Sequence, residues 1–230
     1  MGRVHADGNV AAQDGAQLAL TVLRLAEGNG VVLGDPACDQ LLFVFAGGGH
    51  LDDEPVEAGS AVLVVAGESA NLTAAGPHGL DAVRASIGAG VDLHASMGPR
   101  ERVVAVDDVE PGKATGSRSF QVLFGPHNGS TRATMFVGYI PPGAAPWHYH
   151  LYEEIVWVWQ GSGRYHFAGG VEDLSAGAAF WIAPREVHIV ENSSTDRELV
   201  VVGIFTPAGS PSAAYLMPDV AASYVIGASP

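Results

Sequence analysis

The chain has 230 residues, of which 47% are hydrophobic, so it is long enough and apolar enough to bury a substantial core. Its formal net charge is -14 at pH 7, which argues against nucleic acid or an anionic membrane surface as a partner. Cys38 is the only cysteine, which rules out an intrachain disulfide. The sequence has no apolar signal segment and no apolar run of membrane-spanning length, so we expect a cytoplasmic protein.

The first half of the chain reads as a series of short β-strands. Branched and apolar residues form runs that end at glycine-rich turns, a pattern typical of strands. These runs lie at residues 18–26, 41–47, 61–67 and 82–90, and the first of them is also compatible with a short helix. The polar segment 106–119 indicates a connection between two halves. We therefore expect one domain over residues 1–108 and a second over residues 109–230.

Potential metal ligands lie close together in the second half. His148, His150 and Glu154 have even numbers, so on an extended strand they face the same side, whereas Glu153 faces the other. Imidazole and carboxylate are ligands that borderline divalent metals prefer, and His188 supplies a further imidazole. We therefore predict a metal site formed by His148, His150, Glu154 and His188.

The first of these segments resembles a motif of the cupin superfamily, G-x5-H-x-H-x3-E-x6-G. His148, His150, Glu154 and Gly161 fit it without a gap, and Gly143 lies one residue too close to the first histidine. The resemblance implies a β-barrel of the jelly-roll type around the metal.

The second cupin motif, G-x5-P-x-G-x2-H-x3-N, is matched less completely. Gly177, His188 and Asn192 keep its spacing, while Ala183 and Arg185 stand where the motif has proline and glycine. The resemblance is therefore specific at the metal ligand and loose in the turn before it. We expect Asn192 to fix a loop rather than to contact substrate.

The first half resembles a diverged copy of the second. When residues 40–47 are aligned with residues 154–161, the strand and the glycine after it coincide. The positions of the metal ligands then carry side chains that are poor ligands: Gly34, Pro36, Gln40 and Ala70. The overlay predicts an all-β bicupin of two tandem cupin-type jelly-roll barrels, of which only the second binds metal.

Residues near the predicted ligands are candidates for contact with substrate. Arg185 could hold a substrate carboxylate, or it could be a solvated loop arginine. Arg164 and His166 share the parity of the ligands, although His166 is equally compatible with a structural role in the barrel. Tyr139 and Phe180 are expected to form an apolar wall.

Two tryptophans are expected to face away from the metal. Trp157 and Trp159 have the opposite parity to Glu154, so they would leave an apolar patch exposed unless another surface covers them. We expect them to pack against the other half or another subunit, and we expect a homo-oligomer, most simply a dimer.

The resemblance implies a metal-dependent enzyme that acts on a small organic molecule. Three imidazoles and one carboxylate suit Fe or Mn, while Ni, Zn, Co and Cu also fit. We favour dioxygenase-type chemistry, with Glu154 doubling as a base. The alternatives are a redox-neutral isomerase, decarboxylase or amidohydrolase, such as the ureidoglycine aminohydrolase-like bicupins, and a non-catalytic binding protein.

Overall fold

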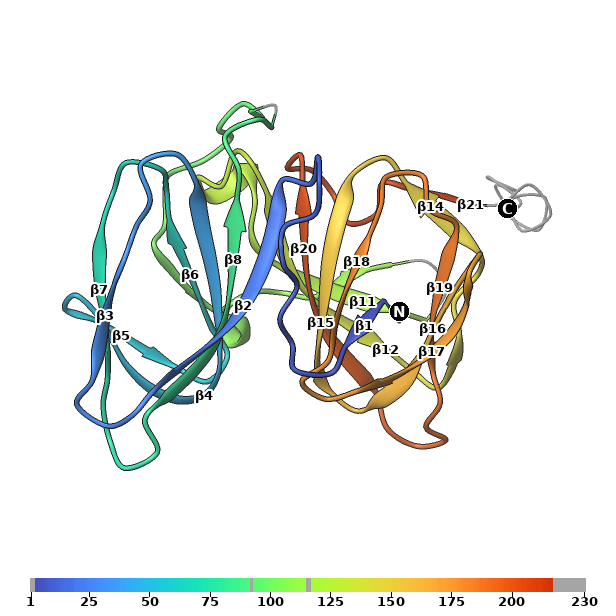
Figure 1. Ribbon diagram of the computed structural model, residues 1–230, viewed down its shortest axis with the longest axis horizontal. Helices are drawn as coiled ribbons and strands as arrows, with labels where there is room; N and C mark the ends of the chain where they lie inside the picture. The colour runs from blue at the N-terminus through green and yellow to red at the C-terminus, as the bar shows by residue number, and fades with distance from the viewer. Residues whose placement is uncertain (1–2, 92, 115–116, 217–230) are drawn as a thin grey trace, which may run out of the picture.

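The computed structural model describes residues 3–91, 93–114 and 117–216, and these residues are built almost entirely of strands. Figure 1 shows two β units side by side, one formed by the blue and green first half and one by the yellow and red second half. The described residues contain 3-10 turns at Val106–Asp108 and Pro126–Asn128 and no longer helix. No helix in this part of the chain is long and apolar enough to cross a membrane.

The first unit is built on antiparallel strands in the order β2-β8-β4-β6-β9, with β3, β5 and β7 joined to the far end of β4. Its first run of apolar residues is a strand and not a helix. The bounds are β2 Leu18–Leu25, β3 Gly30–Leu33, β4 Asp39–Leu51, β5 Glu54–Glu57, β6 Ser60–Val64, β7 Ala70–Ala74, β8 Leu80–Ile87 and β9 Val103–Ala105.

The second unit has two sheets that enclose an interior. One has the order β1-β18-β15-β20-β12-β11-β10 and the other β17-β16-β19-β14-β21, with β13 on β19. The bounds are β1 Val4–His5, β10 Gly112–Lys113, β11 Ser119–Phe124, β12 Thr134–Ile140, β13 Gly143–Ala144, β14 His148–His150, β15 Glu153–Gln160, β16 Ser162–Phe167, β17 Gly170–Ser175, β18 Ala179–Ile182, β19 His188–Asn192, β20 Leu199–Thr206 and β21 Ala214–Leu216.

The two units share the strand pairing that the internal overlay predicts. β4 pairs with β6 and β8, as β15 pairs with β18 and β20. Both central strands carry a bulge at the equivalent place, between Val44 and Ala46 in one and between Val158 and Gln160 in the other. β7 begins at Ala70 and β19 at His188, the positions that the overlay equates.

Aliphatic side chains form a core inside the first unit. The members of this cluster are almost completely buried: Leu33, Leu42, Val44, Leu51, Val56, Val62, Val64, Ala70, Leu72, Ala74, Leu80 and Ala82. Such a core stabilises a barrel by burial alone.

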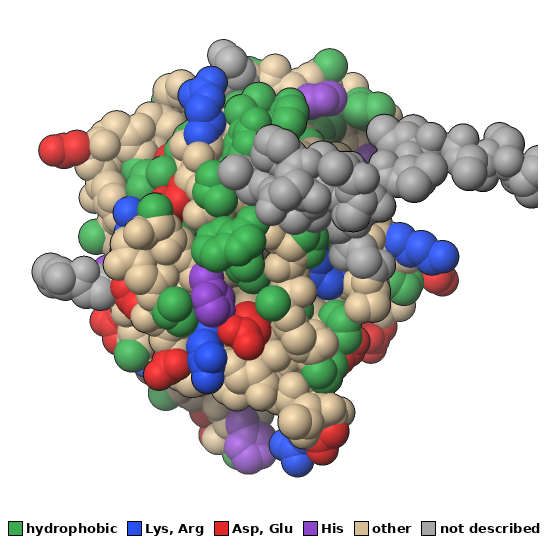
Figure 2. Space-filling view, turned by 90° about the vertical axis from the view of Figure 1, so that its right-hand side faces the viewer, with side chains coloured by type: hydrophobic (Ala, Val, Ile, Leu, Met, Phe, Trp, Pro, Cys, Tyr) green, Lys and Arg blue, Asp and Glu red, His purple; other side chains and the backbone are tan. Residues whose placement is uncertain are grey.

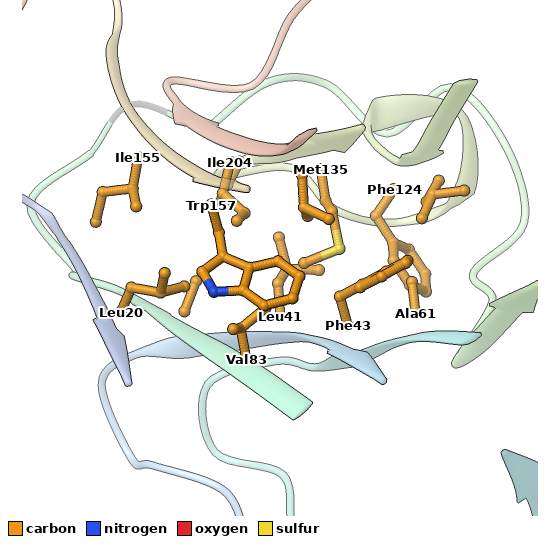
Figure 3. Packing of buried hydrophobic residues seen from close by; sticks show 14 of the residues in the cluster. Leu20, Leu41, Phe43, Ala61, Val83, Phe124, Met135, Ile155, Trp157 and Ile204 are labelled. Atoms are coloured by element: carbon orange, nitrogen blue, oxygen red, sulfur yellow. The ribbon is translucent and has the colours of Figure 1, made fainter. Parts of the chain in front are cut away.

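A larger core lies between the two units and contains both tryptophans of β15. Trp157 is 3% exposed and packs on Phe45 with ring centroids 4.8 Å apart, and Trp159 meets Phe43 edge-on, also at 4.8 Å. Figure 3 shows side chains of both halves, including Leu41 and Trp157, pointing toward one another in this core. The tryptophans therefore cover the first half of the same chain.

The expected boundary near residue 108 falls between β9 and β10, but the N-terminal arm crosses it. Val4 and His5 of β1 pair with Phe180 and Ala179 of β18, at the edge of the second unit. The first residues of the chain therefore complete a sheet of the second barrel, and the division of the sequence into 1–108 and 109–230 does not describe this strand.

Candidate metal centre and cavity

The predicted ligands come from both sheets of the second barrel and face its interior. His148 and His188 are direct partners across β14 and β19, and their ring centroids lie 4.4 Å apart. His150 lies two residues along β14, with its ring 5.0 Å from that of His188. Glu154 is on β15 in the opposite sheet, so the four side chains meet between the sheets. All four are buried.

The backbone fixes which nitrogen of each histidine is protonated. Nδ1 lies 2.9 Å from the carbonyl oxygen of Pro146 in His148, 2.7 Å from that of Tyr152 in His150, and 2.9 Å from that of Glu186 in His188. A carbonyl oxygen can only accept, so Nδ1 of each neutral ring carries the proton. Each Nε2 is then left with a lone pair, which is the form that binds a metal.

His150 and Glu154 lie in close contact without a hydrogen bond between them. Nε2 of His150 lies 3.1 Å from Oε2 of Glu154, yet it is buried and has no hydrogen-bond partner. A neutral imidazole nitrogen and an ionised carboxylate oxygen both offer lone pairs, so they repel at this distance unless a proton or a cation lies between them. The donor set therefore fits a divalent cation.

The predicted ligand atoms lie close together but are not arranged as the coordination sphere of one metal ion. In the described part of the chain, no group of three or more His, Cys, Asp or Glu side chains is already positioned to hold one metal ion. Binding one ion through all four residues thus requires side-chain adjustment. The direction of the three Nε2 lone pairs and the orphaned His150 Nε2 are the features that favour such binding.

Burial holds two of the histidines neutral. It lowers the pKa of His148 from 6.5 to about 3, with a further contribution from the nearby charge of His188. It also lowers the pKa of His188 from 6.5 to about 4. At neutral pH both rings are therefore available as ligands without first losing a proton.

A cavity of about 120 Å³ lies beside these side chains. It is bounded by the four predicted ligands and by residues of β11, β12, β15, β18, β20 and β21. Gly203 of β20 keeps the space next to Glu154 open, because a Cβ there would lie 2.8 Å from Oε1 of the carboxylate and 2.3 Å from the Phe136 ring.

Arg118 and Tyr152 line this cavity and were not among the residues predicted from sequence. Arg118 precedes β11, and its positive charge is one of the causes that lower the pKa of His148 and of His188. The Tyr152 ring is stacked between those of His150 and Phe205, with both centroid distances 4.0 Å. The only sequence signal for Tyr152 was its even number, which Tyr152 shares with the ligands.

Arg164 and His166 lie on the outside of the barrel, contrary to the parity argument. The bulge at Trp159 inserts a residue into β15, so the inward side changes from even to odd numbers and Tyr165 becomes the buried residue. Arg164 is exposed near Asp173, and His166 lies 2.6 Å from Glu191. Figure 2 shows the side of the molecule that carries β16, β17 and β19, where histidine, acidic and basic side chains lie next to one another.

Arg185, Phe180 and Tyr139 also differ from their predicted roles. The Arg185 side chain is exposed and does not line the cavity, and its backbone N–H donates to the carbonyl of His150 at 2.7 Å. Phe180 is fully buried against Tyr165, outside the cavity lining. Tyr139 does border the cavity, but its hydroxyl donates to Gln121, and its ring packs against the core between the halves.

Two neighbours of the ligands are structural. The Glu153 carboxylate points away from the cavity and accepts from the N–H of Gln17 at 2.6 Å, which is consistent with the choice of Glu154. Asn192 donates to the carbonyls of Ile140 and Arg197 at 2.8 and 2.7 Å, so it fixes the connection after β19.

Comparison with known proteins places this architecture. Residues 135–205 match the family model described as a cupin domain. The fold is that of the cupins. This confirms the predicted all-β jelly-roll fold. A search of curated proteins finds no match.

Solved structures with the same fold include oxalate decarboxylases. A mutant of the Bacillus subtilis enzyme superposes with a TM-score of 0.72 at 15% identity, covering 92% of this chain and 74% of the other. A structure on the substrate binding mode of oxalate decarboxylase gives 0.75 at 14% identity, with coverages of 97% and 81%. A cupin 2 conserved barrel domain protein from Leptotrichia buccalis gives 0.59 at 13% identity, with 86% and 87%. At these identities the likeness is one of fold.

Proposed function

We propose that this protein is a metal-dependent enzyme acting on a small organic molecule in the cavity of its second half. His148, His150, Glu154 and His188 hold one divalent transition metal, with Fe or Mn favoured over Ni, Zn, Co and Cu. The observation that carries the proposal is the buried, unpartnered Nε2 of His150 beside Glu154. A cation held there would supply Lewis acidity and, for iron or manganese, a redox couple.

The residues around the ligands prepare the cavity for chemistry. The carboxylate of Glu154 lies inside the barrel, where it can take a proton from the substrate or return one. Tyr152 packs flat on His150 and holds that ring in place. The apolar side chains of the opposite wall exclude water, which strengthens the electrostatic interactions of the bound substrate.

Two reaction classes are compatible with this arrangement. Oxygen-dependent oxidation of a chelating substrate is the first, because three imidazoles and one carboxylate leave positions open on a metal with octahedral geometry. Redox-neutral chemistry such as decarboxylation is the second, and the structural similarity to oxalate decarboxylases favours it. The Bacillus subtilis member of that group has Mn(II) centres.

Metal analysis and oxygen uptake separate these possibilities. Protein purified without added metal should contain about one equivalent of iron or manganese per chain. Oxygen uptake by the iron-loaded protein with phenolics, diketones or hydroxy acids supports oxidation, whereas turnover under anaerobic conditions supports the redox-neutral class. Ligand-induced stabilisation without any turnover would mean a binding protein and would contradict the enzyme proposal.

A further inference from the structure

The cavity has two unlike sides. The sheet of β14 and β19 supplies the predicted ligands His148, His150 and His188. The facing sheet supplies Glu154 and a group of aromatic and branched side chains that carry no hydrogen-bonding atoms: Phe120, Phe136, Ile140, Val156, Ile182 and Val201. A molecule bound at the histidines therefore lies against an apolar wall.

This wall is continuous with the ligands. The Phe120 and Phe136 rings lie 6.4 Å apart, and Phe136 and Phe205 lie 6.1 Å apart. Phe205 then stacks on Tyr152 and Tyr152 on His150, each at 4.0 Å. An apolar group attached to a metal-binding head would thus meet the aromatic rings of Phe120, Phe136 and Tyr152, which line the cavity.

Phe136 and its glycine neighbours limit the size of what can bind. A Cβ at Gly138 would lie 3.2 Å from both the Phe136 ring and Val201, so this wall has no spare room. The cavity volume is about 120 Å³. An engineered apolar cavity of about 150 Å³ takes up benzene, so the space here suits a body of about three to five carbons.

The polar end of the cavity favours a negative charge. The guanidinium group of Arg118 borders the same space as the predicted ligands. A metal ion would add two further positive charges, against the one carboxylate of Glu154. A carboxylate group at this end is attracted by both the cation and the guanidinium.

We propose that the substrate is a small monocarboxylate with a compact apolar body, for example a branched 2-oxo or 2-hydroxy acid. The inference rests on the proposed metal site, because the carboxylate and its neighbouring oxygen bind there. A doubly charged acid without an apolar part, such as oxalate, would leave the wall of Phe136 and Val201 without a hydrophobic partner. Any second carboxylate turned toward that wall would lack a compensating charge.

A ligand series with one head group tests this. Manganese-loaded protein is titrated by calorimetry, under anaerobic conditions, with 2-oxobutanoate, 2-oxo-3-methylbutanoate, 2-oxo-4-methylpentanoate, phenylpyruvate and oxalate. Affinity should rise about fourfold for each buried methylene up to the five- or six-carbon acids. Affinity should be lower for phenylpyruvate, because its ring is too large for the space beside Phe136.

Two variants decide whether Phe136 sets the limit. Phe136→Leu enlarges the cavity and should make phenylpyruvate the most tightly bound acid of the series. The affinity for that acid should rise at least tenfold. Phe45→Leu makes the same substitution in the core between the two halves, where Phe45 of the first half packs on Trp157, and should leave the order of affinities unchanged.

The outcomes distinguish this inference from the function on which it rests. Flat affinities across the series, or oxalate as the tightest ligand, would overturn the apolar-body proposal while leaving the metal site intact. A wild-type protein that binds no manganese after equilibrium dialysis would overturn the proposed function and this inference together.

Discussion

The backbone and the hydrophobic interior together keep the cavity histidines in one protonation state. Each of His148, His150 and His188 donates from Nδ1 to a carbonyl within two residues of it in the sequence. For His148 and His188, burial then opposes the addition of a second proton by lowering the pKa of each ring. The rings are therefore prepared for a cation before one binds, and the protein's stability depends on pH as a consequence.

Acidification should destabilise the metal-free protein. Below pH 6.5 the unfolded chain binds protons at His148 and His188, while the folded chain does not until about pH 3 and 4. Since the unfolded state binds more protons, the free energy of unfolding should decrease as the pH is lowered. The decrease is at most about 1.4 kcal/mol per histidine for each pH unit. Urea unfolding between pH 7 and pH 4.5 measures this.

Variants assign this pH dependence to the cavity. His148→Gln should reduce the slope of unfolding free energy against pH, because one buried titrating group is removed. His50→Gln changes an exposed histidine and should leave the slope as it is. Equal slopes in all three proteins would contradict the assignment.

Arg185 shows how a family glycine can be replaced at a conformational cost. Its φ of 64° is in the left-handed region, where a residue with a Cβ is strained by about 1 kcal/mol. We predict that Arg185→Gly raises the free energy of unfolding by up to about 1 kcal/mol and leaves metal binding unchanged, because the side chain is exposed. A loss of metal affinity in this variant would show that the Arg185 side chain does contribute to the metal site.

Parity on an extended strand correctly placed His148, His150 and Glu154 at the cavity, but it misplaced Arg164 and His166. It selected Glu154 over Glu153, and the structure places these carboxylates on opposite sides of β15. It failed beyond Trp159 because a bulge inserts one residue, and Arg164 was assigned to the interior as a result. A single bulge is set by pairing with β20, which local sequence does not reveal.

The N-terminal arm is connected to one of the predicted ligands by a chain of side chains. The Arg3 guanidinium lies over the Phe167 ring at 4.6 Å and donates to the carboxylate of Glu186. That carboxylate also accepts from the Tyr165 hydroxyl at 3.0 Å, while the carbonyl of Glu186 receives Nδ1 of His188. These contacts link Arg3 to His188, and we expect Arg3 to help position that ring.

Removal of Arg3 should weaken metal binding without changing the fold. We expect Arg3→Ala to raise the dissociation constant for Mn(II) about tenfold, as is common when an outer partner of a metal-binding histidine is lost. Arg24→Ala is the matched control, because Arg24 is an exposed arginine near Asp81 in the first half. An unchanged dissociation constant for Arg3→Ala would mean that the arm does not position His188.

This arm could not be predicted from sequence. β1 spans Val4–His5, too short to show any alternation of apolar and polar residues. Its pairing with β18 joins two segments that lie far apart in the sequence. The longer strand β4 was visible because its apolar run at residues 41–47 ends at a glycine-rich turn.

The two barrels differ in what their interiors contain. The first has an interior of aliphatic side chains and presents Phe43 and Phe45 to the second. The second has the cavity, and its strand β15 carries Glu154 on one face and Trp157 on the other. The internal overlay of the sequence predicts that only the second barrel binds metal, because it places small or neutral residues at every ligand position of the first half.

The packing between the barrels should be a major source of stability. Trp157→Ala removes a side chain that is 3% exposed and should lower the free energy of unfolding by about 3–5 kcal/mol. Trp147→Ala removes a tryptophan that is 40% exposed and should cost much less. Equal losses in denaturant unfolding would show that the interface contributes little.

The metal content of the wild-type chain and of the His148→Ala variant tests the proposed metal centre most directly. One divalent ion per wild-type chain, and none in the variant at the same protein concentration, is the predicted result. Half of the metal remaining in the variant would reveal a second site in the first barrel. Full retention, or a wild-type protein that binds no metal, would contradict a centre formed by His148, His150, Glu154 and His188.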